Sequence, residues 1–371
     1  MQDSNRRKFI KSAAAAAVIS TTGAISSCGT TIKEEEGPKI NLNNKYKWKM
    51  VTTWPPNFPV LGEACNLFAQ WVNEMSAGRM EIEVYGGGEL IPALECFDAV
   101  SNGAVEMSNG AAYYWAGKIP AAQFFGSVPF GMNAQQMNAW IMNGGGNEIW
   151  DEIYAPFDLR ALPAGNTGVQ AGGWYNREIN TLADLNGLKM RMPGLGGKVL
   201  TRAGGTSVLV AGGELFTNLE RGVIDATEWI GPYHDYLMGF HKVAKYYYYP
   251  GWHEPGTIME MLLNKPKFEA LPTDLQMIIK AASYQANHWV LSEFEAKNSI
   301  YLKKLQEESD VSIRPFPDEV LYKLQKIGGE VIQELVESDP TSKRVFEHYD
   351  NFKTSIAGWS AMSEKTYYEK F

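Results

Sequence analysis

An alternation of strand and helix patterns near the beginning of the chain constrains its fold more than any other feature. Lys47–Thr53 has the composition of a strand, and apolar residues recur at helical spacing over Val60–Ser76. Met80–Tyr85 alternates between apolar and polar residues, and Pro92 opens a second helical segment. This succession predicts an α/β unit with a largely parallel sheet.

The length of the chain predicts more than one such unit. With 371 residues the chain is too long for a single compact core, and two lobes of roughly 100 to 200 residues each are expected. Residues 98–106 and 217–225 share a helix end, a glycine and a short apolar strand closed by an acid. We therefore expect two similar α/β lobes, and the helical pattern from Pro272 to Lys304 is long enough for a helix shared by both.

The N-terminal segment has the pattern of an export signal. Arg6 and Arg7 stand in a basic stretch before the apolar residues 13–19, and this resembles a twin-arginine signal, with an ordinary secretory signal as the alternative. Residues 25–29 resemble a lipoprotein cleavage box in which Cys28 would be acylated, although a chance cysteine fits equally well. We expect residues 1–27 to be a signal peptide and 28–45 a solvated tether.

Composition excludes several functions. The net charge is -8, and loss of residues 1–27 would remove four basic and one acidic side chain, giving -11. Such a chain lacks the basic excess of nucleic-acid-binding proteins. Three cysteines and five histidines are too few for a disulfide scaffold or a thiolate zinc site. Export would permit a disulfide between Cys65 and Cys96, but two buried free thiols fit the sequence as well.

Motifs of enzymes are mostly missing. The glycine-rich stretch before Lys198 suggests a phosphate loop, but Met192 replaces its first glycine and Val199 its magnesium-binding hydroxyl residue. His253 and Glu254 could form an acid/base pair, or a pair on the surface or at a crossing between lobes. The sequence thus assembles no nucleophile, base and oxyanion hole.

Two charged residues stand out in aromatic, glycine-rich surroundings. Arg191 ends the short strand pattern that begins at Lys189, and its planar guanidinium matches the two oxygens of a small carboxylate. Glu228 follows Thr227 and precedes Trp229, where a buried carboxylate needs a cation.

Several longer stretches carry a family resemblance. They are residues 165–170, 187–191, 213–215, 222–229, 231–233 and 246–252. They closely resemble the substrate-binding proteins of tripartite ATP-independent periplasmic (TRAP) transporters, the DctP family, and most of all the branch that binds 2-oxo acids such as pyruvate. The resemblance runs over nearly all of residues 46–330.

The resemblance implies a periplasmic binding protein-like α/β fold, with a ligand cleft between two lobes and a long hinge helix. Lobe I would comprise residues 46–165 and 253–330 with that helix, and lobe II residues 166–252. Helices in residues 331–371 would follow, with a possible role in a homodimer. The expected function is extracytoplasmic capture of a small carboxylate for a permease of a small and a large membrane subunit.

The resemblance also implies a site. Arg191 would bind the carboxylate of the ligand, while Gln170, Glu228 and the backbone of Trp229 would hold a cation. Oxygen ligands suit a hard ion, sodium or calcium. Asn166 lies four residues before Gln170, and strand alternation would put both on one face, which makes Asn166 an expected donor to the ligand.

Aromatic walls would come from Tyr113, Tyr114 and Trp252, with packing in the core as the alternative, which fits Trp252 equally well. At Trp252-His253-Glu254 relatives more often have two tryptophans before the acid, which leaves the ligand open. Two other functions compete with this one, an enzyme acting on 2-oxo or 2-hydroxy acids and a sensor that presents its ligand to a receptor.

Overall fold

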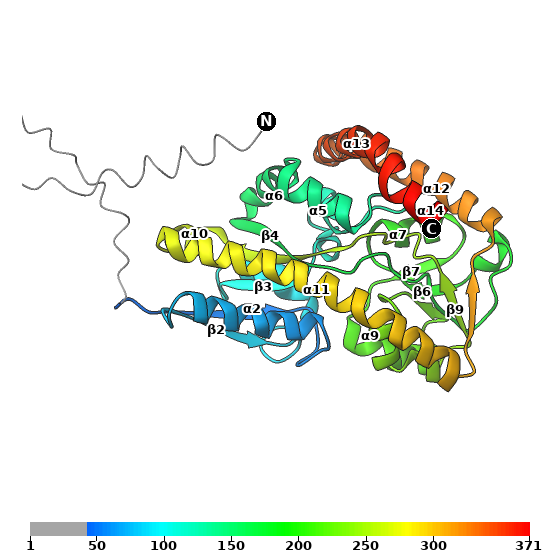
Figure 1. The fold of residues 1–371 in the computed structure, drawn as a ribbon, viewed down its shortest axis with the longest axis horizontal. Coiled ribbons are helices and arrows are strands. Elements are labelled where there is room, and N and C mark those ends of the chain that lie inside the picture. The colour runs from blue at the N-terminus through cyan, green and yellow to red at the C-terminus, as the bar shows by residue number, and fades with distance from the viewer. Residues whose placement is uncertain (1–42) are drawn as a thin grey trace, which may run out of the picture. The chain divides into compact units, whose positions relative to one another are not determined.

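The computed structural model describes residues 43–371, and a five-stranded sheet is formed by strands within residues 46–166 together with one strand from residues 258–264 (Figure 1). Its strand order is β2-β1-β3-β10-β4. The strands are β1 (Tyr46–Thr52), β2 (Met80–Tyr85), β3 (Met107–Ala111), β4 (Leu159–Asn166) and β10 (Ile258–Asn264). β1 pairs in parallel with β2 and β3, whereas β10 runs antiparallel to β3 and β4. The sheet is therefore mixed rather than fully parallel.

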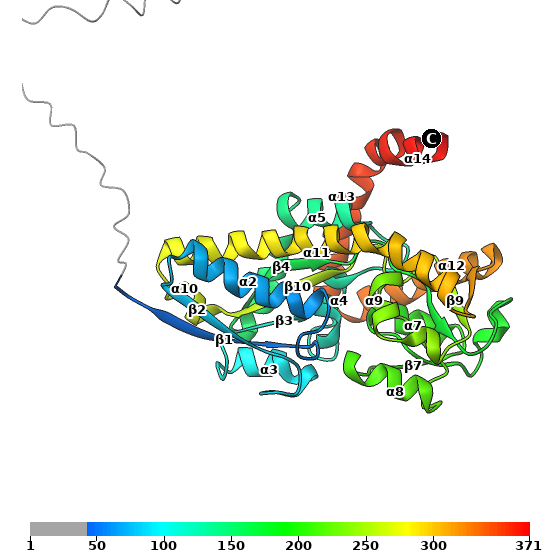
Figure 2. The same cartoon turned by 60° about the horizontal axis from the view of Figure 1, so that its bottom comes forward.

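Helices cover both faces of this first sheet. α2 (Leu61–Met75) buries Leu61, Phe68 and Val72 at helical spacing and keeps its polar residues outside. α3 (Cys96–Ser101) lies on the opposite face (Figure 2). The alternation of strand and helix expected from residues 47–103 is confirmed, although the second helix is only six residues long.

A second sheet of six strands follows, in the order β11-β9-β5-β8-β6-β7. The strands are β5 (Gly173–Tyr175), β6 (Lys189–Arg191), β7 (Thr206–Val208), β8 (Ala226–Thr227), β9 (Tyr246–Tyr249) and β11 (Ser312–Pro315). The sequence placed residues 253–330 with the first lobe, but β11 pairs in parallel with β9. That assignment is wrong for this strand, because the preceding helix carries the chain back to the second sheet.

The long helix α11 (Thr273–Glu308) runs alongside both sheets (Figure 1). With 36 residues it is about 54 Å long. Its first half packs on β4 and α2, and its second half packs on α9 (Pro232–Leu237). One continuous helix therefore supports both halves of the molecule.

Two further connections pass between the sheets and bond to each other. The chain crosses after β4 and returns after β9, and the Gln170 amide donates to the Glu254 carbonyl (3.2 Å). In the other direction, Gly251 donates to the carbonyl of Gln170 (2.8 Å). A side chain at Gly251 would come within 2.3 Å of that carbonyl oxygen, so the contact requires glycine. These bonds hold residues 170 and 254 beside one another.

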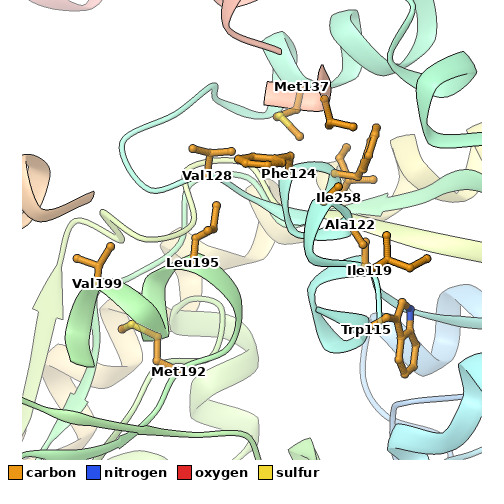
Figure 3. Packing of buried hydrophobic residues seen from close by; sticks show 14 of the residues in the cluster. Trp115, Ile119, Ala122, Phe124, Val128, Met137, Met192, Leu195, Val199 and Ile258 are labelled. Carbon is orange, nitrogen blue, oxygen red and sulfur yellow. The ribbon is translucent and has the colours of Figure 1, made fainter. Parts of the chain in front are cut away.

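Apolar packing also joins the two halves. Phe124 and Val128 lie next to Leu195 of α7 (Gly194–Arg202) in one buried cluster (Figure 3). Cys65 and Cys96 are both buried in the core, and both thiols are free among the described residues.

The remaining helices complete the two halves and the C-terminus. They are α4 (Gln123–Gly126), α5 (Ala134–Asn143), α6 (Gly146–Tyr154), α8 (Leu215–Glu220), α10 (Lys265–Glu269), α12 (Asp318–Ser338), α13 (Pro340–Ser360) and α14 (Thr366–Lys370). α12 packs on α7 and on α13. The end of α13 and α14 project from the body of the molecule (Figure 2).

A buried carboxyl group lies in the middle of the first sheet. Glu260 of β10 is fully buried and accepts hydrogen bonds from the Trp115 indole and from the Tyr154 hydroxyl (3.0 Å). Burial raises the pKa of Glu260 to about 7, and the two hydrogen bonds oppose this shift. The folded state therefore binds this proton more tightly than the unfolded chain does.

We expect Glu260→Gln to raise the Tm at pH 8 and to leave the Tm at pH 4.5 nearly unchanged. Because the folded-state pKa lies above its ordinary value, the carboxyl favours folding most at low pH and progressively less as the pH rises to about 7. The gain at pH 8 is on the order of 1 to 3 kcal/mol. The exposed Glu95→Gln serves as control. Equal gains at both pH values would contradict the assignment.

Candidate functional site

Arg191 is the centre of the candidate site and is almost fully buried at the end of β6. Its guanidinium forms an ion pair with Glu228 and donates to the Tyr114 hydroxyl (3.1 Å) and the Val210 carbonyl (3.3 Å). It also lies 5.1 Å from the ring centre of Trp229. Burial by itself would lower the pKa of Arg191, but Glu228 raises the pKa above its ordinary value. The group therefore stays charged, and it carries more N–H groups than these bonds use.

Aromatic rings enclose a small space beside this guanidinium. Trp54 and Tyr114 meet edge to face at 6.4 Å, and Trp54 and Trp229 meet at 6.5 Å. The space is lined by these rings together with Tyr113, Gln170 and Arg191, among others. Its volume is about 10 Å³, room for little more than one water molecule. A larger molecule could enter only if the surrounding residues moved apart.

The sequence missed Trp54 as a wall of this space. Its indole donates to Asn109 (2.6 Å), which fixes the ring at the end of β1. An aromatic residue at the end of a predicted strand of an α/β sheet was the available signal, because ligands bind at such ends.

Two predicted residues lie elsewhere. Trp252 does not line the space, since its ring stacks on Phe130 at 5.7 Å. Asn166 ends β4, and its side chain accepts from the Gly168 amide (2.9 Å) and so closes a turn. Gln170 lies beyond that turn and not on the strand. The argument from strand alternation was therefore wrong, because the chain leaves the sheet between the two residues.

Gln170 and Glu254 form a buried polar pair. The Gln170 amide nitrogen donates to the Glu254 carboxylate (2.8 Å) and to the Thr167 hydroxyl (3.1 Å). The same carboxylate oxygen accepts from Thr257 (2.6 Å). These bonds orient the amide, and its oxygen is a buried acceptor without a partner among residues 43–371. Such an oxygen is suited to a hydrogen-bond donor or to a hard cation.

Glu228, His253 and Glu254 form a buried cluster next to this oxygen. One potential metal ligand atom from each lies within 4.8 Å of the others. The His253 ring nitrogen is 3.5 Å from the Glu228 carboxylate but is not aligned for a hydrogen bond. From the sequence, His253 and Glu254 fitted an acid/base pair, a surface pair or a pair at a crossing between lobes. They do lie at a crossing, but the aromatic setting that drew attention to Glu228 also applied to them.

The balance of charge in this cluster is unfavourable as it stands. Burial, and next the Glu228 carboxylate, raise the pKa of Glu254 to about 7. Arg191 offsets only one of the two carboxylates. A bound cation would supply the missing positive charge, and the carboxylate oxygens together with the Gln170 oxygen fit such an ion. The structure thus brings together Arg191, Tyr113, Tyr114, Gln170, Glu228 and Trp229, which the sequence singled out, and it adds Trp54, His253 and Glu254.

The profile of the bacterial extracellular solute-binding proteins of family 7 (DctP) matches residues 50–339. The chain belongs to this family. Its members are binding proteins, which confirms the expected function class and argues against an enzyme. The family also indicates a place outside the cytoplasm.

Three similar proteins are described as binding 2-oxo acids or were solved with pyruvate bound. A monocarboxylate 2-oxoacid-binding periplasmic protein of Nostoc sp. is 40% identical over 352 residues, 95% of this chain and 95% of the relative. TRAP periplasmic solute-binding proteins of Colwellia psychrerythraea, with calcium and pyruvate, and of Pseudoalteromonas atlantica, with sodium and pyruvate, are each 40% identical. Both have a TM-score of 0.86 and cover 88% of this chain and 100% of theirs.

A fourth similar protein was solved as a dimer. A TRAP solute-binding protein of Bordetella bronchiseptica is 37% identical, with a TM-score of 0.86 over 88% of this chain and 97% of its own. It is described as a mixed-occupancy dimer, with calcium and picolinate in one active site and the other site apo. The family resemblance and the two-lobed α/β fold expected from the sequence are thereby confirmed.

The comparisons identify neither the export route nor a lipid anchor. The twin-arginine residues and Cys28 lie outside the described residues. Within residues 43–371, no helix has both the length and the apolar character needed to cross a membrane.

Proposed function

We propose that this TRAP solute-binding protein captures a small 2-oxo or 2-hydroxy monocarboxylate together with a calcium or sodium ion. It then delivers the acid to a permease made of a small and a large membrane subunit. The observation that carries this proposal is the charged, buried guanidinium of Arg191 in a space lined by aromatic rings.

Arg191 supplies the anchor for the carboxylate. Its free N–H groups can donate to two carboxylate oxygens in parallel, and the low-polarity surroundings strengthen both bonds. Tyr114, which already contacts the guanidinium, has a hydroxyl within reach of the same ligand. The carboxylate of Glu228 keeps the guanidinium charged and fixed before the ligand arrives.

The cation completes the charge balance. Glu228 and Glu254, with the side-chain oxygen of Gln170 and the backbone of Trp229, would provide oxygen ligands for calcium or sodium. An incoming monocarboxylate adds a second uncompensated negative charge beside Arg191. Ligand and cation should therefore bind together, each raising the affinity for the other.

The size of the space selects a small acid. Rings of Trp54, Tyr113, Tyr114 and Trp229 close around it, and opening of the lobes has to precede entry. Pyruvate in the Colwellia and Pseudoalteromonas proteins, and picolinate in the Bordetella protein, are ligands of this compact kind. The role of Asn166, which has a buried amide nitrogen without a partner among the described residues, would be to support the Gln170 turn.

Export and attachment follow from the N-terminal residues. Arg6 and Arg7 support passage by the twin-arginine route, and Cys28 is the residue that a lipid anchor would modify. With or without a lipid anchor at Cys28, export leaves residues 43–371 on the outer side of the cytoplasmic membrane, where they can reach the permease.

A second copy of the chain would cover the projecting C-terminal helices. Trp359, Met362, Tyr367, Tyr368 and Phe371 are all more than half exposed there. Together with the dimer of the Bordetella relative, this apolar surface supports a homodimer. We expect sedimentation to give a dimer at micromolar concentration and a monomer after deletion of residues 359–371. A full-length monomer would contradict this assembly.

A thermal-shift screen tests the function directly. The exported chain is heated with saturating pyruvate, other 2-oxo acids, lactate, dicarboxylates and amino acids, each with calcium, with sodium or with a chelator. The proposal expects a rise in Tm for small monocarboxylates that is larger when the cation is present. A response only to dicarboxylates or amino acids, or turnover of pyruvate by the pure protein, would overturn it.

A further inference from the structure

His234 of α9 is a fully buried residue that the proposed site does not use. Both of its ring nitrogens are engaged. The Trp229 indole donates to Nδ1 (2.7 Å), and Nε2 lies 2.7 Å from the Pro59 carbonyl oxygen. Because a carbonyl can only accept, Nε2 carries the proton and Nδ1 is the acceptor. The hydrogen bonds therefore require one neutral tautomer of the ring.

The two partners of His234 come from different halves of the molecule. Trp229 follows β8 of the second sheet, whereas Pro59 lies in the loop between β1 and α2 of the first sheet. The imidazole also packs edge to face on Phe58 at 4.6 Å and on Phe294 of α11 at 5.7 Å. His234 thus lies where both lobes and the shared helix meet.

The ring that His234 holds is a wall of the candidate site. Trp229 lies over the Arg191 guanidinium and against Trp54. At the end of the ring away from its nitrogen the indole is closely packed, because a side chain at Gly212 would come within 2.5 Å of a carbon of the six-membered ring. The bond from the indole nitrogen to His234 adds a directional contact that fixes the orientation of the ring.

We propose that His234 is a positioning residue and a latch, which joins closure of the lobes to the placement of Trp229 over the ligand. This inference rests on the proposed function. When the lobes separate, the bond from Nε2 to Pro59 must break, whereas the bond to Trp229 stays within one lobe. The closed state alone contains the full pair of bonds, so His234 favours closure and slows release of the ligand.

Two substitutions separate the two bonds. In His234→Asn the side-chain oxygen can take the place of Nδ1 and accept from Trp229, but no donor reaches Pro59. In His234→Gln the amide nitrogen can take the place of Nε2 and donate to Pro59. His241→Phe is the matched control, because His241 stacks on Tyr236 at 4.5 Å and does not contact the site.

The first measurement is the kinetics of pyruvate binding with calcium. We expect His234→Asn to raise the dissociation rate about 10- to 100-fold. In this variant the Pro59 carbonyl is buried without a donor in the closed state but not in the open state, so the substitution destabilises the closed state and speeds opening. The association rate should change little. His234→Gln should restore slow dissociation in large part, and His241→Phe should match the wild type. Equal dissociation rates in all four proteins would overturn the latch.

The second measurement needs no ligand. Amide hydrogen exchange is followed in residues 57–64 and 228–236, with the Tm of each variant as a check on folding. The latch predicts faster exchange in both segments for His234→Asn and near wild-type exchange for His234→Gln. If the wild type fails to bind pyruvate, the proposed function is wrong while this measurement still decides the latch. Unchanged exchange in His234→Asn would overturn it.

Discussion

Arg191→Ala is expected to abolish the rise in Tm that pyruvate and calcium give with the wild type. The variant loses the paired donors to the carboxylate, and charge-assisted bonds of this kind contribute about 1.5 to 3 kcal/mol each, so affinity should fall roughly 100-fold or more. Calorimetric titration gives the same quantity independently. The exposed Arg221→Ala, on the same lobe, should keep the full response.

Stability has to be separated from binding in this experiment. Removal of Arg191 leaves Glu228 buried without its partner, which typically costs about 3 to 5 kcal/mol and lowers the Tm of the free protein. The double variant Arg191→Ala with Glu228→Gln removes this unpaired charge. It should regain stability but no response to pyruvate. A ligand-induced rise in Tm as large as that of the wild type would remove Arg191 from the site.

Glu254→Gln and Glu228→Gln should each make pyruvate binding insensitive to calcium and sodium. In the wild type we expect a chelator, or omission of sodium, to weaken binding by about 5- to 150-fold, the usual range of coupling between two ligands. Each variant removes one of the negative charges that the cation offsets, while glutamine keeps the size of the side chain. Calorimetric titration of pyruvate with and without the ion measures the coupling.

Glu260→Gln is the matched control for these two variants. Glu260 is as deeply buried as Glu254, yet its carboxylate contacts Trp115 and Tyr154 and lies outside the cluster. Its replacement should leave the effect of calcium unchanged. A wild type that binds pyruvate equally well with chelator and without sodium would show the cation assignment to be wrong.

Local patterns were sufficient for most of the secondary structure. The strand from Tyr46, the helix from Leu61 and the strand from Met80 each match their apolar periodicity, because one buried face fixes the spacing of apolar residues. The same holds for α11, whose length alone suggested a helix shared by two lobes. The place of β11 was not predictable in this way, since strand pairing depends on where the preceding helix ends.

The site was predicted in part, for a related reason. Arg191 and Glu228 stood out because a charge among aromatic residues needs a partner, and the structure pairs them with each other. Trp252 and Asn166 had similar surroundings in the sequence but turned away from the enclosed space. Trp252 lies in a loop and Asn166 is the last residue of β4, so the regular alternation of side chains along a strand does not reveal where they point.

The sequence by itself determined the α/β class and the two-lobed organisation and singled out Arg191 and Glu228, because burial and charge compensation leave marks within short segments. Only the tertiary structure decided that Trp54 and Glu254 lie beside them and that His234 contacts Trp229. These residues lie on separate segments, and the two crossings with their bonds between Gln170, Gly251 and Glu254 bring those segments together. Contacts between distant segments depend on packing in space, and no local pattern in the chain encodes them.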